Sequence, residues 1–128
     1  MQFELVSPER RLAAMEASAV TIPGIAGDLT AMPNHAPFLT TLRPGLLVVT
    51  ASGGTTEYFV SGGFAEISPE AVSILAEEAV ERAAVTPELL ERLTREAQEA
   101  LEIAGEDTRA AAAIRVNDFI QLASRLPG

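Results

Sequence analysis

The sequence predicts a β + α chain, with an N-terminal antiparallel β-sandwich of about ten short strands followed by a C-terminal two-helix antiparallel hairpin. Over roughly the first 83 of the 128 residues, short apolar segments are separated by glycine and proline turns, as in a sandwich or barrel. Beyond Thr86 the apolar residues recur at three- and four-residue steps, as on one face of a helix. We therefore expect a sandwich domain over residues 1–83 and a helical hairpin over residues 84–128.

The first half of the predicted sandwich contains five strand-like segments. They cover residues 2–6, 10–15, 18–22, 27–32 and 38–42. Pro23-Gly24 should form a turn, because proline fixes φ and glycine tolerates positive φ, and Gly27-Asp28 should repeat the same turn. We expect the stretch from Thr21 to Gly45 to display a tight, rigid corner at the surface.

The second half of the sandwich contains a run of apolar residues, Leu46 to Thr50, which indicates a strand buried on both faces. Ser52-Gly53-Gly54 predicts a hairpin leading into a strand over residues 55–60. Gly62-Gly63 should break that strand before the next, over residues 64–67. In the last strand, residues 71–76, Val72, Ile74 and Ala76 alternate with the side chains expected to point outward.

The first helix of the hairpin is predicted to start at Thr86-Pro87-Glu88, with Thr86 as N-cap and Pro87 at the first helical position. Gly105 should end it, and Glu106 or Asp107 should begin a second helix that runs to Pro127-Gly128. The expected apolar stripes are Leu89, Leu93, Ala97, Ala100, Leu101 and Ala104 on the first helix, and Ala112, Ala113, Val116, Phe119, Ile120, Ala123 and Leu126 on the second. Because these stripes are rich in alanine, they bury little area, and we expect a loosely held hairpin.

Composition excludes several classes of function. A net charge of −9 argues against nucleic acid and against adhesion to anionic lipid. The chain has no cysteine and therefore no thiolate metal site, and no apolar run approaches the roughly 18 residues of a membrane-spanning helix. The start of the sequence lacks the features of an export signal, so a cytoplasmic location is expected.

The sequence contains no recognisable catalytic or metal-binding constellation. The absence of lysine excludes a P-loop, and the single histidine, His35, has no other imidazole to join in a zinc site. We expect His35 to hydrogen-bond its own turn, with a partner contact as the alternative. Asp28 could cap a turn or recognise basic groups of a partner. Glu77-Glu78 should be a solvated charge cluster where the sandwich meets the linker.

Several separate motifs resemble one known family. Pro33-Asn34-His35-Ala36-Pro37, preceded by Gly27-Asp28-Leu29 and followed by Leu42-Arg43-Pro44-Gly45, is similar to the N-terminal domain of the epsilon subunit of bacterial F-type ATP synthases. The likeness continues through Val60 to Ile67. Because these motifs occur in the family's order and the lengths of both halves fit, the resemblance covers nearly the whole chain.

The resemblance implies a central-stalk rotor subunit that couples proton-driven rotation to ATP synthesis without doing chemistry itself. In the family the sandwich binds the gamma subunit and rests on the polar loops of the c-ring. The implied interface residues in this chain are Gly27, Asp28, Leu29, Pro33, His35 and Pro37, with Asp28 as the polar contact. The implied location is the cytoplasmic face of the bacterial inner membrane, as a peripheral part of the complex without membrane insertion.

For the hairpin, the resemblance implies a regulatory arm that restrains ATP hydrolysis. Arg109, Arg115 and Arg125 are then candidates for contacts with the alpha and beta catalytic subunits, or simply exposed arginines that keep an alanine-rich helix soluble. Some relatives bind ATP through Ile/Leu-Asp-x-x-Arg-Ala. Here Leu89-Leu90-Glu91-Arg92-Leu93 keeps the arginine but lacks the aspartate, so we expect no cofactor. A nucleotide-binding regulatory sensor and a sandwich enzyme are the alternative functions.

Overall fold

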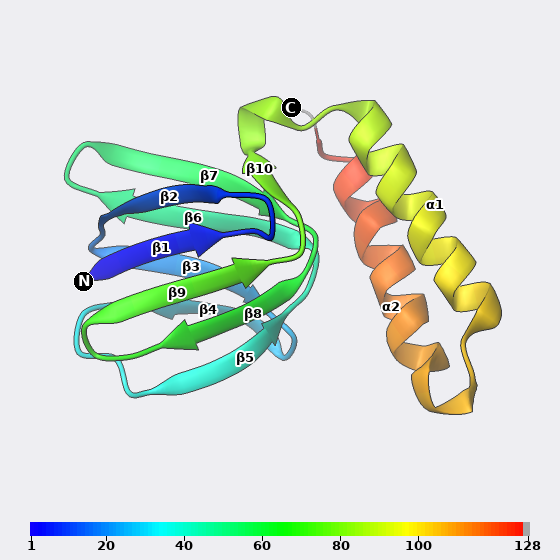
Figure 1. Ribbon diagram of the computed structural model, residues 1–128, viewed down its shortest axis with the longest axis horizontal. Coiled ribbons are helices and arrows are strands. Elements are labelled where there is room, and N and C mark those ends of the chain that lie inside the picture. The colour runs from blue at the N-terminus through cyan, green and yellow to red at the C-terminus, as the bar shows by residue number, and fades with distance from the viewer. Residues whose placement is uncertain (127–128) are drawn as a thin grey trace. The chain divides into compact units, whose positions relative to one another are not determined.

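The computed structural model describes residues 1–126 and divides into two compact units, Met1–Arg82 and a second unit that begins at Ala83. The first unit consists of strands and the second of helices, as Figure 1 shows. The predicted β + α class is therefore confirmed.

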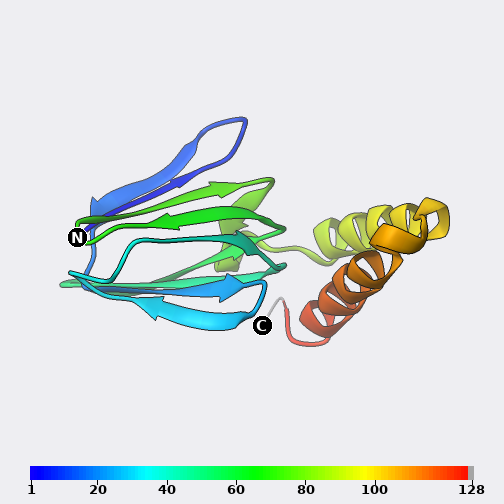
Figure 2. The same ribbon diagram turned by 90° about the horizontal axis from the view of Figure 1, so that it is seen from below.

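The ten strands of the first unit form two layers of five, which Figure 2 shows edge-on. In hydrogen-bonding order, one layer contains β5 (Phe38–Leu42), β8 (Gly63–Ile67), β9 (Ala71–Ala76), β1 (Gln2–Val6) and β2 (Arg11–Glu16). The other contains β10 (Ala79–Glu81), β7 (Gly54–Val60), β6 (Gly45–Ala51), β3 (Ala19–Gly24) and β4 (Gly27–Ala31). A single β3–β5 pairing, Gly24 with Leu42, links the two layers.

The core lies between these layers and consists of the apolar side chains at alternate strand positions. The predicted alternation in β9 is confirmed, because Val72, Ile74 and Ala76 are buried. Phe3 of β1 stacks on Tyr58 of β7 with ring centroids 6.4 Å apart. Burial, with a smaller contribution from the Glu81 carboxylate, raises the pKa of Tyr58.

The predicted turns at Pro23-Gly24 and Gly27-Asp28 are wrong. Pro23 pairs with Asp28 and Gly24 with Gly27, so both dipeptides lie within strands and the turn consists of residues 25–26. Proline is tolerated in β3 because the pairing with β6 ends at Thr21, and no neighbouring strand there requires its missing N–H.

Two further expectations for the sandwich need correction. Strand β6 is not buried on both faces, because buried Leu47 and Val49 alternate with half-buried neighbours. Strand β10 was not foreseen. It follows Glu77-Glu78, where Glu77 is exposed and Glu78 is half-buried. The backbone N–H of Glu78 donates to Ser61 Oγ (3.1 Å), and its carbonyl accepts from the Ser61 N–H (3.0 Å).

The second unit opens with a short 3-10 helix, Arg82–Ala84, at the boundary, followed by α1 (Pro87–Ile103). The predicted start of α1 is confirmed, because Thr86 Oγ1 accepts from the Leu89 N–H at 3.1 Å and Pro87 is the first residue. The buried residues are Leu90, Leu93 and Ala97. The predicted stripe thus missed Leu90 and wrongly included Ala100, which is exposed.

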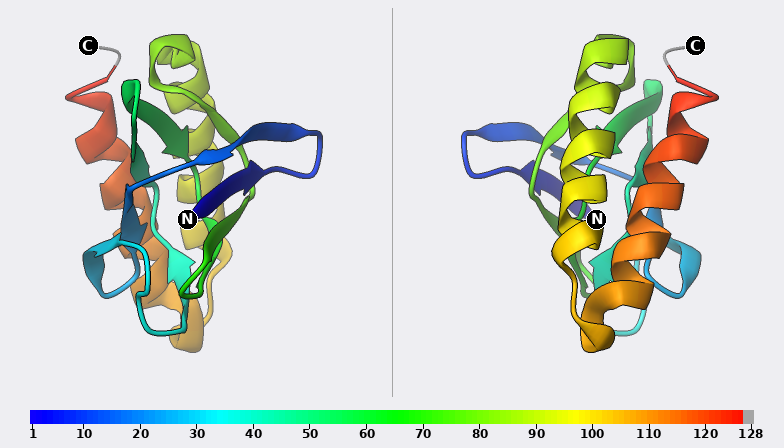
Figure 3. Two further views of the ribbon diagram at one scale, coloured as in Figure 1. Left: turned by 90° about the vertical axis from the view of Figure 1, so that its left-hand side faces the viewer. Right: turned by 90° about the vertical axis from the view of Figure 1, so that its right-hand side faces the viewer.

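Helix α2 (Glu106–Ala123) lies beside α1 and runs in the opposite direction, as Figure 3 shows. Val116 and Phe119 are buried as predicted, whereas Ile120 and Ala123 are exposed and Leu122 is buried in their place. The helix ends at Ala123 instead of continuing, and Pro127-Gly128 lies outside the described residues. Helix α1 ends at Ile103, two residues before Gly105, whose φ is −79°.

We expect Gly63→Ala to lower the free energy of unfolding by at least about 2 kcal/mol, measured by urea denaturation. Gly63 has a φ of +133°, and a Cβ there would overlap the Leu75 carbonyl oxygen of the paired strand β9. Gly53→Ala is the matched control, since a Cβ at Gly53 meets no atom within 4 Å. Equal effects of the two substitutions would contradict this account of the β7–β8 connection.

Candidate functional site

The residues predicted to form one tight corner lie at the two ends of β4. Gly27, Asp28 and Leu29 begin the strand, and Pro33, His35 and Pro37 belong to the loop that follows it. At about 3.3 Å per residue, Asp28 and Pro33 are separated by roughly 16 Å along the strand. The strand predicted between these two groups of residues is therefore confirmed, and they lie on an extended surface.

Asp28 lies next to the β3–β4 turn and is exposed. The turn is held by backbone bonds, including one from the Ile25 N–H to the Thr41 carbonyl (3.0 Å). Within residues 1–126 the Asp28 carboxylate has no hydrogen bond or ion pair. Asp28 is therefore not a turn cap, and its charge faces solvent.

The loop after β4 is rigid because several hydrogen bonds hold its backbone in place. Asn34 adopts a left-handed conformation with φ of 70°, and its N–H donates to the Pro69 carbonyl at 2.8 Å. The His35 N–H donates to the Met32 carbonyl (3.0 Å), and His35 Nδ1 lies 2.7 Å from the Ala36 carbonyl oxygen. Because a carbonyl only accepts, Nδ1 carries the proton. His35 thus bonds its own turn, one of the two roles considered for it.

Strand β4 is the last strand of one layer and β5 the last strand of the other, with β5 at the lower edge of the sandwich in Figure 1. β4 pairs only with β3, and β5 meets β3 only at Leu42, so each strand has a largely unpaired edge. We call residues 25–39 the β4–β5 edge. It carries four exposed large apolar side chains, which sequence reasoning missed: Ile25, Met32, Phe38 and Leu39, the last 67% exposed.

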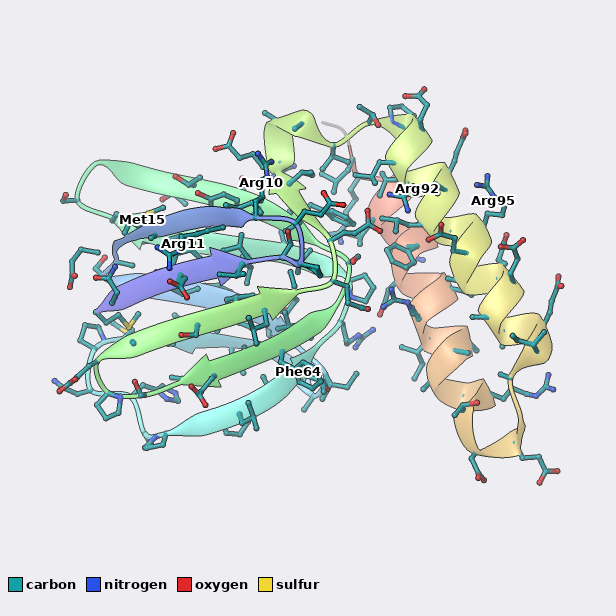
Figure 4. All side chains as sticks on the ribbon, in the orientation of Figure 1. Arg10, Arg11, Met15, Phe64, Arg92 and Arg95 are labelled. Carbon is teal, nitrogen blue, oxygen red and sulfur yellow. The ribbon has the colours of Figure 1, made fainter. Side chains whose placement is uncertain are left out.

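A second exposed apolar surface lies on the outward side of β8 and β9. Phe64 and Leu75 sit directly opposite each other in the strand register and are 53% and 58% exposed. Leu75 in turn faces Val6 of β1, and Phe64 faces Thr41 of β5. We call this row the β8–β9 face; Figure 4 labels Phe64 on it. Apolar side chains at solvent-facing positions of alternating strands were the signal available in the sequence.

The three arginines predicted as inhibitory contacts do not form one cluster. Arg109 Nη2 donates to the Ala104 carbonyl oxygen at 3.3 Å, near the tip of the hairpin. The Arg115 guanidinium lies 5.0 Å from the centre of the Phe119 ring, a cation–π distance. Arg125 follows the end of α2 and is exposed. At 1.5 Å per helical residue, Arg109 and Arg125 are about 20 Å apart or more.

A groove of about 480 Å³ lies between α1 and α2. Its lining residues are Pro87, Leu90, Glu91, Thr94, Arg95, Gln98, Ile120, Ala123 and Leu126. Figure 4 labels Arg92 and Arg95 on α1, but only Arg95 lines the groove, and Arg92 pairs with Glu96 at 3.4 Å. One arginine offset by one glutamate leaves the lining near neutral, which does not fit a triphosphate.

Neither a metal nor a membrane site is evident in the part of the chain that the structure describes. Residues 1–126 contain no group of three or more histidine, cysteine or acidic side chains that could hold a metal ion. Within the same residues, neither helix combines the length and apolar character required to span a bilayer.

Comparison with known proteins gives the family. Residues 1–82 match the family described as "ATP synthase, Delta/Epsilon chain, beta-sandwich domain". The ATP synthase epsilon chain of Rhodobacter capsulatus is 48% identical over 126 residues, which cover 98% of this chain and 96% of that protein. This chain belongs to the ATP synthase epsilon-chain family. The epsilon chain of Ruegeria sp. (strain TM1040) is 57% identical over 107 residues, or 84% of this chain and 78% of that one.

Solved structures share the fold of this epsilon chain. A chain in the cryo-EM structure of the Euglena gracilis mitochondrial ATP synthase (OSCP/F1/c-ring, rotational state 1) matches with a TM-score of 0.71 and 28% identity, over 97% of this chain and 79% of that one. A chain in the central stalk/c-ring structure from Tetrahymena thermophila matches with a TM-score of 0.69 at 18% identity, which is a likeness of fold alone.

Proposed function

We propose that this epsilon chain is a central-stalk rotor subunit that couples proton-driven rotation to ATP synthesis and does no chemistry itself. The observation that carries the proposal is the 48% identity to an epsilon chain over 98% of this sequence. Its two exposed apolar surfaces suit a subunit that works through contacts. The part of the complex that contains it would be peripheral, at the cytoplasmic face of the bacterial inner membrane.

The β4–β5 edge is the proposed contact with the c-ring. It combines one unpaired carboxylate, Asp28, with exposed Ile25 and Met32 along a strand that has a free edge. The pinned loop around Asn34 gives the surface a fixed shape before binding, which lowers the entropic cost of association. Gly27, Leu29, Pro33, His35 and Pro37 would shape this surface, and Asp28 would supply its polar contact.

The β8–β9 face is the proposed contact with the gamma subunit. A cross-strand pair of large apolar side chains, each more than half exposed, suits a long-lived interface, since permanent interfaces are more apolar than transient ones. Leu39 of β5 lies diagonally from Phe64 across the β5–β8 pairing, so the two proposed surfaces adjoin each other. One epsilon chain can therefore contact the gamma subunit and the c-ring at the same time.

The hairpin is the proposed regulatory arm that restrains ATP hydrolysis. Of the three candidate arginines, Arg125 has the most open position for a contact with the alpha and beta subunits, whereas Arg109 and Arg115 already have intramolecular contacts. We further propose that this arm binds no nucleotide. Leu89 and Leu90 stand near the position of the family's aspartate, and the groove lining carries no net positive charge.

We expect Asp28→Arg to reduce proton-driven ATP synthesis by the assembled complex while changing the stability of the chain by less than about 0.5 kcal/mol, because Asp28 is exposed. The measurement is ATP synthesis in inverted membrane vesicles. Glu9→Arg makes the same charge change at an exposed site between β1 and β2 and should leave synthesis unchanged. Unchanged synthesis with Asp28→Arg would remove Asp28 from the interface.

We expect Leu75→Asp to weaken binding to the purified gamma subunit by at least about tenfold, because burial of a leucine contributes about 1.5–3 kcal/mol and the new carboxylate would be desolvated. Affinity is measured by calorimetric titration. Ile103→Asp introduces the same carboxylate at an exposed apolar residue of the hairpin, and it should bind gamma normally. Equal affinities for both variants and the unmodified chain would place the interface elsewhere.

A further inference from the structure

Burial in the helical hairpin is confined to one half of its length. The buried residues of α1 are Leu90, Leu93 and Ala97, and those of α2 are Val116, Asp118, Phe119 and Leu122. Every one of the intervening residues, 98–115, is exposed or half-buried. We call residues 98–115 the tip and the helical segments 87–97 and 116–123 the base.

The tip leaves apolar side chains in solvent instead of burying them. Ile103 is 87% exposed and Ile114 is 49% exposed. The half-buried apolar residues that remain between the helices there are Leu101, Ala104 and Ala112, and alanine contributes little buried area. Since helices in proteins derive most of their stability from packing, the tip contributes little to its own folding.

The helix ends at the tip are also weakly capped. α1 has no basic residue in its last turn, and Glu99 and Glu102 place negative charge near the negative end of its dipole. The N-cap of α2 is Gly105, which has no side chain to bond the first N–H groups, so the stabilisation at this end comes from the charges of Glu106 and Asp107 in the first turn. The base differs, because Thr86 caps α1 through a 3.1 Å hydrogen bond. One side-chain hydrogen bond at the tip runs from Arg109 Nη2 to the Ala104 carbonyl oxygen.

We propose that the hairpin opens from its tip: residues 98–115 separate and fray as a local unit while the base stays packed. The hydrogen bond from Arg109 to the Ala104 carbonyl oxygen holds the closed tip together. Local opening is expected where buried contacts are fewest. The inference deepens the proposed regulatory role of the hairpin, because α2 then becomes accessible from its N-terminal end before Phe119 leaves its packing.

Hydrogen exchange of the full chain, followed by mass spectrometry, tests the order of opening. The amides compared are those with helical partners: 91–97 and 116–123 in the base, and 98–103 and 110–115 in the tip. We expect the tip amides to exchange at least about tenfold faster than the base amides after correction for intrinsic rates, through openings that precede global unfolding. Equal protection of tip and base, or better protection of the tip, would overturn the proposal.

Two substitutions shift the tip in opposite directions. Gly105 has an extended backbone, with φ of −79° and ψ of −179°, and a Cβ there meets no atom within 4 Å, so Gly105→Ser can cap α2 without strain. We expect Gly105→Ser to slow tip exchange by about threefold. Arg109→Gln removes the hydrogen bond to the Ala104 carbonyl oxygen but keeps a good helix former at this position. It should speed tip exchange by about two- to threefold.

Arg125→Gln is the matched control, because it removes an exposed arginine beyond the other end of α2 and should leave tip exchange unchanged. If Gly105→Ser and Arg109→Gln shift base and tip amides equally, the hairpin opens as one unit and the proposal fails. ATPase assays of the assembled catalytic head with the same variants address the regulatory role separately. If the tip amides exchange first but the variants leave ATP hydrolysis unchanged, the proposed order of opening stands and the proposed restraint of hydrolysis by the hairpin is refuted.

Discussion

One backbone junction determines how the sandwich is closed. Gly24 of β3 pairs with Leu42 of β5, and the bonds from Ile25 N–H to the Thr41 carbonyl and from Arg43 N–H to the Pro23 carbonyl flank that pair. This junction joins the two layers at one end and leaves one edge of β4 and most of one edge of β5 unpaired. The exposed edge, and the position of Asp28 beside it, are consequences of this closure.

The two apolar surfaces follow from the same arrangement. Each strand buries one side, so Phe64 and Leu75 must face outward opposite the buried positions of β8 and β9. On β5, Thr40 and Leu42 point inward, which turns Leu39 to the outside, next to both surfaces. Outward-facing leucine and phenylalanine cost solubility, and a sandwich that keeps them is suited to permanent neighbours.

Much of the fold could be predicted from the sequence, because period-two alternation and turn residues are local signals. β9 and the start of α1 illustrate this success. Pro23-Gly24 shows the limit, since only the absence of a β6 partner makes a proline acceptable in a strand, and that absence is a long-range property. Similarly, the sequence cannot show that Leu90 instead of Leu89 is buried on α1.

The central claim is that the sandwich by itself carries the contacts that make this epsilon chain a rotor subunit, whereas the hairpin modifies them. A chain that ends after Arg82 tests this most directly, because the first compact unit ends at that residue. The account predicts that the shortened chain unfolds cooperatively and binds the gamma subunit with the affinity of the full chain. A shortened chain that fails to fold, or that folds but no longer binds gamma, would contradict it.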